Sequence, residues 1–184
     1  MKVEAKVLED KDSQTNSDLV FRNELVALMP SLRAFARALC GNPDMANDLS
    51  QDCMMRAWAA RNSYVTDSNF RAWMFTILRN QFYTTIRKNS RMTSLDPEMA
   101  ERVLVQKASQ QDGLHVADVA NALNKLPAEQ REALMLVGAH GISYEEAAQI
   151  TGCAIGTVKS RIARGRAALK RLIEGDNDHP IMTG

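Results

Sequence analysis

The sequence predicts an all-α protein made of two small helical bundles joined by a flexible linker. Apolar residues recur at helical spacing through most of the chain, and no segment alternates apolar and polar residues as a strand does. Residues 89–113 lack this periodicity and separate the two halves. The chain has 184 residues, which is long enough for two small bundles.

Composition excludes several classes of protein. No apolar run approaches the roughly 20 residues of a membrane span, and the polar N-terminus is unlike a signal peptide, so we expect a cytoplasmic protein without a membrane partner. The three cysteines (Cys40, Cys53 and Cys153) form no CxxC pair, which argues against a disulfide framework and against zinc. The sequence has no Gly-rich phosphate loop, metal cluster or nucleophile–base pair. We therefore expect no enzyme activity, no catalytic residue, no metal and no cofactor.

The first bundle is expected to begin after a mobile tail at residues 1–16. Helical periodicity starts at Ser17 and reaches Met29, where Pro30 is expected to break or restart the helix before it ends at Gly41. Asn42-Pro43-Asp44 predicts a new helix that runs to about Ala60, because it combines a capping side chain, a first-turn proline and an acid at the positive helix end. A polar loop over residues 61–68 precedes a long helix over residues 70–88.

The helix that starts at Asn42 carries a predicted protein interface. A helical wheel buries Ala46, Leu49, Cys53, Ala57 and Ala60. The opposite face combines acids with two large apolar side chains, which is typical of a protein-binding surface: Asp44, Asp48, Gln51, Met55 and Trp58. The alternative is that Trp58 folds onto a neighbouring helix as part of the core.

Aromatic and arginine side chains are interleaved over residues 58–88. Seven of the ten aromatic residues lie there, and rings among cations suit unpaired nucleic acid, which stacks on rings and carries phosphates. Core burial is the alternative for most of these rings, and we favour it for Phe70, Phe75 and Phe82. The candidate nucleic-acid residues are Tyr64, Thr76, Arg79, Asn80, Tyr83 and Arg87.

The second bundle ends in a predicted helix-turn-helix. Helices are expected over residues 115–126, 127–138, 143–150 and 155–173, with a tight turn at Thr151-Gly152-Cys153. The last helix carries six basic residues and no acid. On a wheel its apolar stripe contains Val158, Ile162, Gly165, Leu169, Leu172 and Ile173. The residues expected to contact duplex DNA are Thr157, Lys159, Ser160, Arg161, Arg164 and Arg166. The alternative is a solvated basic helix on an ordinary bundle.

These motifs together resemble the extracytoplasmic-function (ECF) sigma factors of bacterial RNA polymerase. Asp48-Leu49-Ser50-Gln51-Asp52 with Arg56-Ala57-Trp58 is similar to their polymerase-binding helix, and Phe70 to Asn80 is similar to their promoter-melting segment. Leu126-Pro127 to Arg131, Ser143 to Ala148 and Gly156 to Arg161 resemble their C-terminal domain. The chain is most similar to the general-stress group of alphaproteobacteria.

The resemblance implies a function, partners and a division into domains. A region 2-like domain (17–88) would bind the clamp helices of the largest polymerase subunit through Asp44, Asp48, Gln51, Asp52, Met55 and Trp58. Its loop over residues 62–69 would capture a flipped base of the downstream promoter element. A region 4-like domain (114–174), which follows the linker (89–113), would read the upstream element. A C-terminal tail (175–184) follows. A small helical anti-sigma protein would hold the chain inactive.

Two other functions fit parts of the sequence. A dimeric helix-turn-helix regulator would need a dimerisation or ligand domain in place of residues 44–88. A sigma-like decoy, which binds an anti-sigma factor without acting on DNA, would not need the basic face over residues 159–166.

Overall fold

The computed structural model describes residues 2–65, 69–93 and 114–174, and all regular structure in these ranges is helical. The first half comprises α1 (Lys2–Cys40), α2 (Pro43–Ala59), the short 3₁₀ helix η1 (Arg61–Ser63) and α3 (Phe70–Thr93). The second half comprises α5 (Leu114–Asn124), α6 (Ala128–Leu134), the π-helical segment η2 (Met135–Ala139), α7 (Tyr144–Thr151) and α8 (Ile155–Glu174). The predicted all-α class is confirmed. Most of the expected linker and the C-terminal tail lie outside the described residues.

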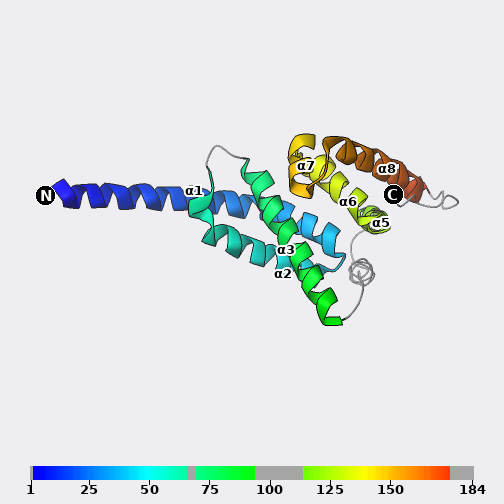
Figure 1. Cartoon of the computed structure of the whole chain (residues 1–184), viewed down its shortest axis with the longest axis horizontal. Coiled ribbons are helices and arrows are strands. Elements are labelled where there is room, and N and C mark those ends of the chain that lie inside the picture. The colour runs from blue at the N-terminus through cyan, green and yellow to red at the C-terminus, as the bar shows by residue number, and fades with distance from the viewer. Residues whose placement is uncertain (1, 66–68, 94–113, 175–184) are drawn as a thin grey trace.

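Helix α1 differs from the prediction at two points. It begins at Lys2, within the expected tail, and its first turns project beyond the rest of the bundle (Figure 1). It also continues through Pro30, so the predicted break there is wrong. A proline inside a helix costs about 3 kcal/mol because it removes a backbone hydrogen bond. Leu28 and Leu32 are both buried on either side of the exposed proline, and this burial offsets the cost.

Helices α1, α2 and α3 enclose the core of the first bundle. Asn42 caps α2 as predicted, since its Oδ1 accepts hydrogen bonds from the backbone N–H groups of Asp44 at 2.9 Å and Met45 at 3.1 Å. The buried face of α2 agrees with the wheel except that Ser50 is also buried and Ala60 is only half-buried. On α3, Phe75 and Phe82 are buried, whereas Phe70 and Ile77 are half-buried.

The second bundle contains one irregularity that the sequence did not predict. The helix expected over residues 127–138 consists of α6 followed by η2, in which the wider turn shifts the register of the side chains. His140 follows directly and its side chain is buried. The irregular segment therefore determines the position of His140.

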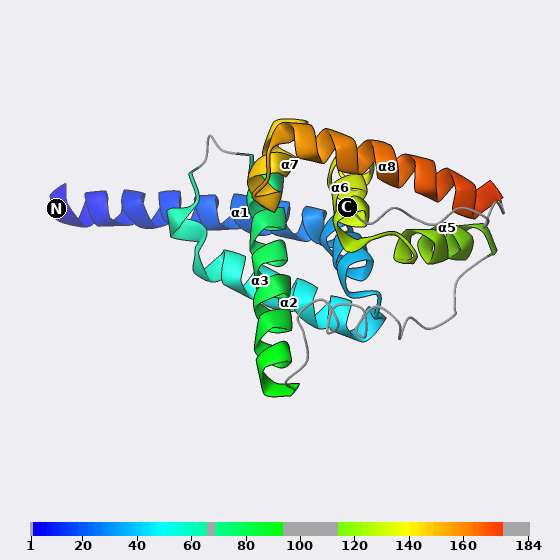
Figure 2. The same ribbon diagram turned by 45° about the vertical axis from the view of Figure 1, so that its right-hand side comes forward.

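The two halves contact each other, although the sequence left their relative placement open. Helix α7 lies beside the first half of α3, and α6 contacts α1 (Figures 1 and 2). Phe35 and Phe75 of the first bundle and Ile142 of the second belong to one continuous core. None of the described helices combines the length and apolarity that crossing a bilayer requires.

Candidate nucleic-acid interface

The turn between α7 and α8 has the geometry of a helix-turn-helix. Ser143 begins α7 with a capping box, in which its Oγ accepts from the N–H of Glu146 at 3.1 Å and its own N–H donates to Glu146 Oε2 at 3.0 Å. Gly152 ends α7 in the left-handed conformation, with φ of 68°. This conformation favours glycine, so the sequence determines where the chain turns into α8.

One face of α8 is fixed against the second bundle. Val158, Ile162, Gly165 and Ala168 are buried, whereas Ile173, which the wheel placed on the buried stripe, is 54% exposed. A Cβ atom added at Gly165 would lie 2.8 Å from Leu134 Cδ1 of α6. The absence of a side chain at Gly165 therefore permits the close approach of α8 and α6.

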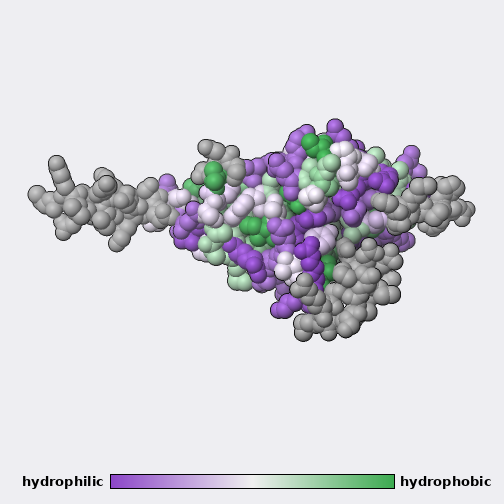
Figure 3. Space-filling view, viewed as in Figure 1, coloured by the Kyte–Doolittle hydropathy of each residue, from purple (hydrophilic) through white to green (hydrophobic). Residues whose placement is uncertain are grey.

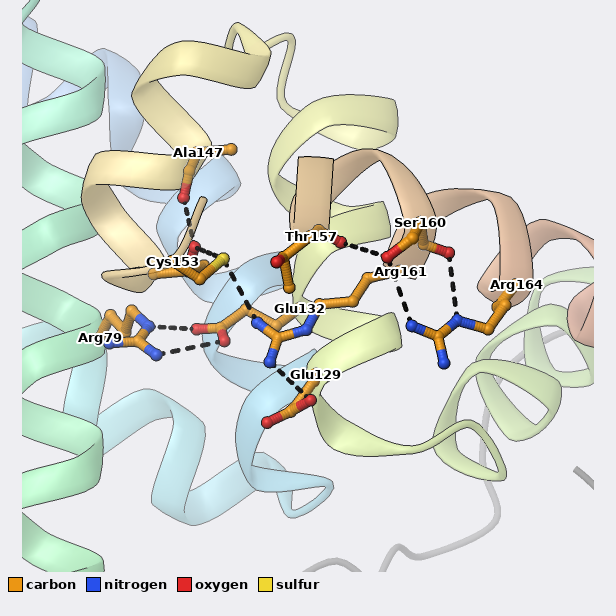
Figure 4. A network of polar contacts seen from close by, with 10 residues as sticks. Arg79, Glu129, Glu132, Ala147, Cys153, Thr157, Ser160, Arg161 and Arg164 are labelled. Carbon is orange, nitrogen blue, oxygen red and sulfur yellow. Dashed lines mark hydrogen bonds and ion pairs between the residues drawn. The ribbon is translucent and has the colours of Figure 1, made fainter. Parts of the chain in front are cut away.

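Four of the six predicted duplex-binding residues of α8 are exposed to solvent. Lys159, Ser160, Arg164 and Arg166 are exposed, and Thr157 is half-buried. Hydrophilic residues cover much of the surface along α8 (Figure 3). The Arg164 guanidinium lies along its own helix, with Nε 3.4 Å from the Ser160 carbonyl oxygen and Nη2 3.3 Å from Ser160 Oγ (Figure 4).

Arg161 differs from its neighbours on α8 because its guanidinium is held inside the second bundle. Nη2 lies 2.6 Å from Glu129 Oε2, and Nη1 donates to Cys153 Sγ at 3.5 Å (Figure 4). The side chain is 17% exposed. This geometry ties the start of α8 to α6 and to the turn, so Arg161 also has a structural role that the sequence did not predict.

The predicted single-strand face of α3 is only partly open. Asn80 and Arg87 are exposed, whereas Thr76 and Tyr83 are half-buried. Thr76 Oγ1 donates to the Ala72 carbonyl at 2.8 Å, and the Arg79 guanidinium lies over the Tyr83 ring at 4.6 Å. Tyr64 is half-buried among aromatic rings, with its ring centroid 5.3 Å from that of Phe70.

The predicted protein-binding face of α2 is exposed along its whole length. Its members are Asp44, Asp48, Gln51, Asp52, Met55 and Trp58. Met55 is 64% exposed and Trp58 is 37% exposed, although the Trp58 ring also lies 6.2 Å from Phe21 and under the Arg61 guanidinium. Asp52 accepts a hydrogen bond from Gln81 at 3.0 Å. The tryptophan thus contacts the core with one edge and solvent with the other.

Comparison with known proteins identifies the family. Residues 25–92 match the family described as Sigma-70 region 2, and residues 117–169 match Sigma-70, region 4. The ECF RNA polymerase sigma factor EcfG of Rhodopseudomonas palustris (strain TIE-1) is 46% identical over 155 residues, which cover 84% of this chain and 86% of the relative. The chain belongs to the ECF sigma factors.

Two solved structures of sigma factors resemble the whole fold. The sigma factor RpoE in complex with the anti-sigma factor NepR from Bartonella quintana has 46% sequence identity and a TM-score of 0.71, covering 85% of this chain and 98% of that one. CnrH in complex with the cytosolic domain of CnrY has 29% identity and a TM-score of 0.64, covering 85% and 89%. The family resemblance inferred from the sequence motifs is confirmed.

Several residues of this sigma factor join its two bundles, and none was singled out from the sequence for this role. Asn69 Nδ2 donates to Glu146 Oε1 at 2.6 Å, and Arg71 Nη1 donates to the His140 carbonyl at 2.8 Å. The His140 ring lies 4.8 Å from Phe75 and 5.9 Å from Phe35. Burial and the nearby Arg71 lower the pKa of His140 to about 4. The hydrogen-bonded partners are 77 and 69 positions apart in the chain, so no local pattern could reveal them.

Proposed function

We propose that this sigma factor directs core RNA polymerase to promoters by dividing the work between its two bundles. Helix α8 reads the upstream promoter element as duplex through Thr157, Lys159, Ser160, Arg161, Arg164 and Arg166. The face of α3 and the preceding loop hold the unpaired downstream element through Tyr64, Thr76, Arg79, Asn80, Tyr83 and Arg87. The boundaries proposed for these units are 17–88 and 114–174. The sigma factor acts in the cytoplasm as a transcription factor and not as an enzyme.

The observation that carries this proposal is the segregation of side chains on α8. Its buried face is apolar, while its outer face carries Ser160 near the helix start and Arg164 and Arg166 further along. Residues near the start of a recognition helix reach base edges in the major groove, and cations along it contact phosphates. The whole chain has a net charge of only +1, so phosphate attraction depends on this local patch.

The exposed face of α2 supports a second contact, with the clamp helices of the largest polymerase subunit. It combines acidic residues with Met55 and Trp58, which suits a partner surface that is basic and apolar. Methionine and tryptophan are both enriched at protein interfaces, and tryptophan is among the residues that dominate their binding energies.

A small helical anti-sigma protein is proposed as the regulator of this chain, with stress-response genes as its targets. Support comes from the two similar structures, which are complexes of a sigma factor with NepR and with CnrY. Their likeness to this chain covers both bundles, which supports a partner of the same kind here.

Transcription in vitro tests the proposed function. Purified chain is added to sigma-free polymerase on a library of promoter templates, and run-off transcripts are sequenced. Site-specific initiation that depends on the chain is the expected result. A chain that binds an anti-sigma protein but produces no site-specific transcript on any template would instead be a sigma-like decoy.

A further inference from the structure

Helices α1 and α2 run antiparallel, so residues at equal height on the two helices can be matched. The Phe21 and Trp58 rings lie 6.2 Å apart, and Arg61 Nε lies 2.9 Å from Asp18 Oδ1, which fixes the register of the pair. Toward the turn that joins the helices, each residue advances about 1.5 Å along its helix axis. Equal numbers of residues counted from Phe21 and from Trp58 therefore reach positions that are level with each other.

Side chains of complementary chemistry lie at matching heights on the two helices. At these heights an arginine of α1 matches an aspartate of α2, and a valine of α1 matches a methionine of α2. To within about 3 Å along the axis, the matched residues are Arg37 with Asp44, Arg33 with Asp48, and Val26 with Met55. All of these side chains are exposed.

The outer face of α1 is basic and apolar. Its members are exposed and lie within about 60° of one another around the helix, away from the buried Phe21 and Leu25. They are Leu19, Arg22, Val26, Arg33 and Arg37. Uncovered apolar side chains bordered by arginines are typical of protein interfaces, in which arginine is enriched.

This outer face of α1 and the exposed face of α2 together form what we call the hairpin surface. Helix α3 crosses α1 and α2 on their other side, where the buried side chains of both helices lie (Figures 1 and 2). The hairpin surface is basic along α1, at Arg22, Arg33 and Arg37, and acidic along α2, at Asp44 and Asp48. One chain therefore carries both halves of a charge-complementary interface.

A two-fold axis parallel to the helices makes the hairpin surface complementary to itself. Rotation about such an axis places α1 of each copy against α2 of the other without changing the height of any residue. Arg33 then faces Asp48 of the second copy, and Val26 faces Met55 of the second copy. Every such contact occurs twice, because the interface is symmetric.

We propose that the hairpin surface binds a second copy of this chain in a two-fold symmetric dimer. The matched heights of opposite charges favour this occupant, since a different partner would not need them on adjacent helices of one chain. The dimer covers Asp48, Met55 and the rest of the exposed α2 face. Dimerisation therefore excludes polymerase from that face, a consequence that rests on the proposed function of α2.

The size of the hairpin surface indicates a weak and reversible dimer. It is about 27 Å long between Leu19 and Arg37, and two adjacent helices are about 20 Å wide. The dimer would bury roughly 1,000 Å² in total, which is at the lower limit for a specific interface. We therefore expect dissociation in the micromolar range, with a monomer at low concentration and an inactive dimer at high concentration.

Complementary charge reversals test the dimer. Arg33→Glu places two carboxylates opposite each other in its own dimer, and Asp48→Lys places two cations opposite each other. Each variant alone should dimerise at least about tenfold more weakly than the wild-type chain, because like charges meet. An equimolar mixture of the two should dimerise again, since both contacts of the mixed dimer join opposite charges. Sedimentation velocity over the micromolar range measures all four samples.

The mixture distinguishes a specific contact from a general effect of charge or folding. Lys125→Glu, an exposed position of the second bundle, makes the same change in net charge as Arg33→Glu and should dimerise like the wild-type chain. A wild-type chain that stays monomeric throughout overturns the proposal. A mixture that dimerises no better than its components also overturns it, because misfolded variants could not restore each other.

Capture by immobilised core polymerase tests the predicted competition. At nanomolar concentration, Arg33→Glu and the wild-type chain should be captured equally, whereas at high micromolar concentration the wild-type chain should show the smaller captured fraction. Weaker capture of Arg33→Glu at nanomolar concentration would assign the α1 face to polymerase instead and overturn the proposal. If the proposed function fails, neither chain is captured at any concentration, while the sedimentation results remain unchanged.

Discussion

Gly165 of α8 lies directly against Leu134 of α6, so close that a Cβ atom on Gly165 would be 2.8 Å from Leu134 Cδ1. Leu134 is buried, and Gln130 Cβ would lie 3.3 Å from the same added atom. The position of the recognition helix therefore depends on a residue that contributes no side chain.

Gly165→Ala is expected to lower the free energy of unfolding by about 1–2 kcal/mol. Overpacking costs about 1–3 kcal/mol, and the better helix propensity of alanine returns up to about 1 kcal/mol. Gly156→Ala is the control, because no atom lies within 4 Å of its added Cβ. Urea denaturation followed by circular dichroism measures both. A Gly165→Ala chain as stable as Gly156→Ala would show that α6 adjusts freely.

Arg164 and Arg161 are expected to differ when each is replaced by alanine. Arg164→Ala should weaken binding to an upstream-element duplex by about 1–3 kcal/mol if the guanidinium reads a base, and leave stability unchanged because the side chain is exposed. Arg161→Ala should also lower stability, by about 1 kcal/mol, because it removes the contact with Glu129. Fluorescence anisotropy and thermal melting separate the two effects. Equal melting temperatures for both variants would contradict the structural role of Arg161.

The α2 face is tested by combining Asp48→Ala with Met55→Ala. Both side chains are exposed, so helicity should stay unchanged while polymerase binding weakens by at least about 1 kcal/mol. Val26→Ala on α1, another exposed apolar side chain, serves as the control and should bind normally. Capture of core polymerase on immobilised chain measures the effect. Equal capture by all three proteins would remove this face from the polymerase interface.

The stability of the chain should depend on pH through His140. Its pKa is about 4 in the folded chain and 6.5 in the unfolded chain, so the unfolded state takes up the proton first as pH falls. This contribution therefore destabilises the fold progressively from about pH 6.5 down to pH 4, by on the order of 3 kcal/mol. His140→Leu lacks this titrating group. The difference in the free energy of unfolding between the wild-type chain and His140→Leu, followed over this pH range, therefore separates the contribution of His140 from those of the carboxylates. A difference that is constant over this range would refute the assignment.

Thiol chemistry should distinguish the three cysteines. Burial raises the pKa of Cys40 and of Cys53 to about 12, which leaves very little reactive thiolate at neutral pH. Cys153 lies in the turn before α8 and is half-buried. We expect the native chain to react at Cys153 alone, and Cys153→Ser to show no rapid reaction with a chromogenic disulfide. Mass spectrometry of the labelled chain identifies the site.

Local sequence signals located the main elements of the fold and the orientation of α8. Asn42 and Ser143 begin helices as expected, because a cap depends only on residues within one turn. The α8 face could be assigned because helical periodicity places its apolar and basic residues on opposite sides. Pro30 shows the limit of such rules, since its local cost was known but the burial of Leu28 and Leu32 that offsets it was not.

The sequence by itself determined the two helical bundles, the helix-turn-helix and the family. Only the tertiary structure decided how the bundles meet. Glu132 and Arg79 are 53 positions apart, and nothing in the periodicity of either helix indicates that they form an ion pair. The same holds for His140, which reaches Phe35 and Phe75 only after the π-helical turn has shifted its direction. Helical periodicity reports which face of a helix is buried, whereas the identity of the partner depends on how the whole chain folds.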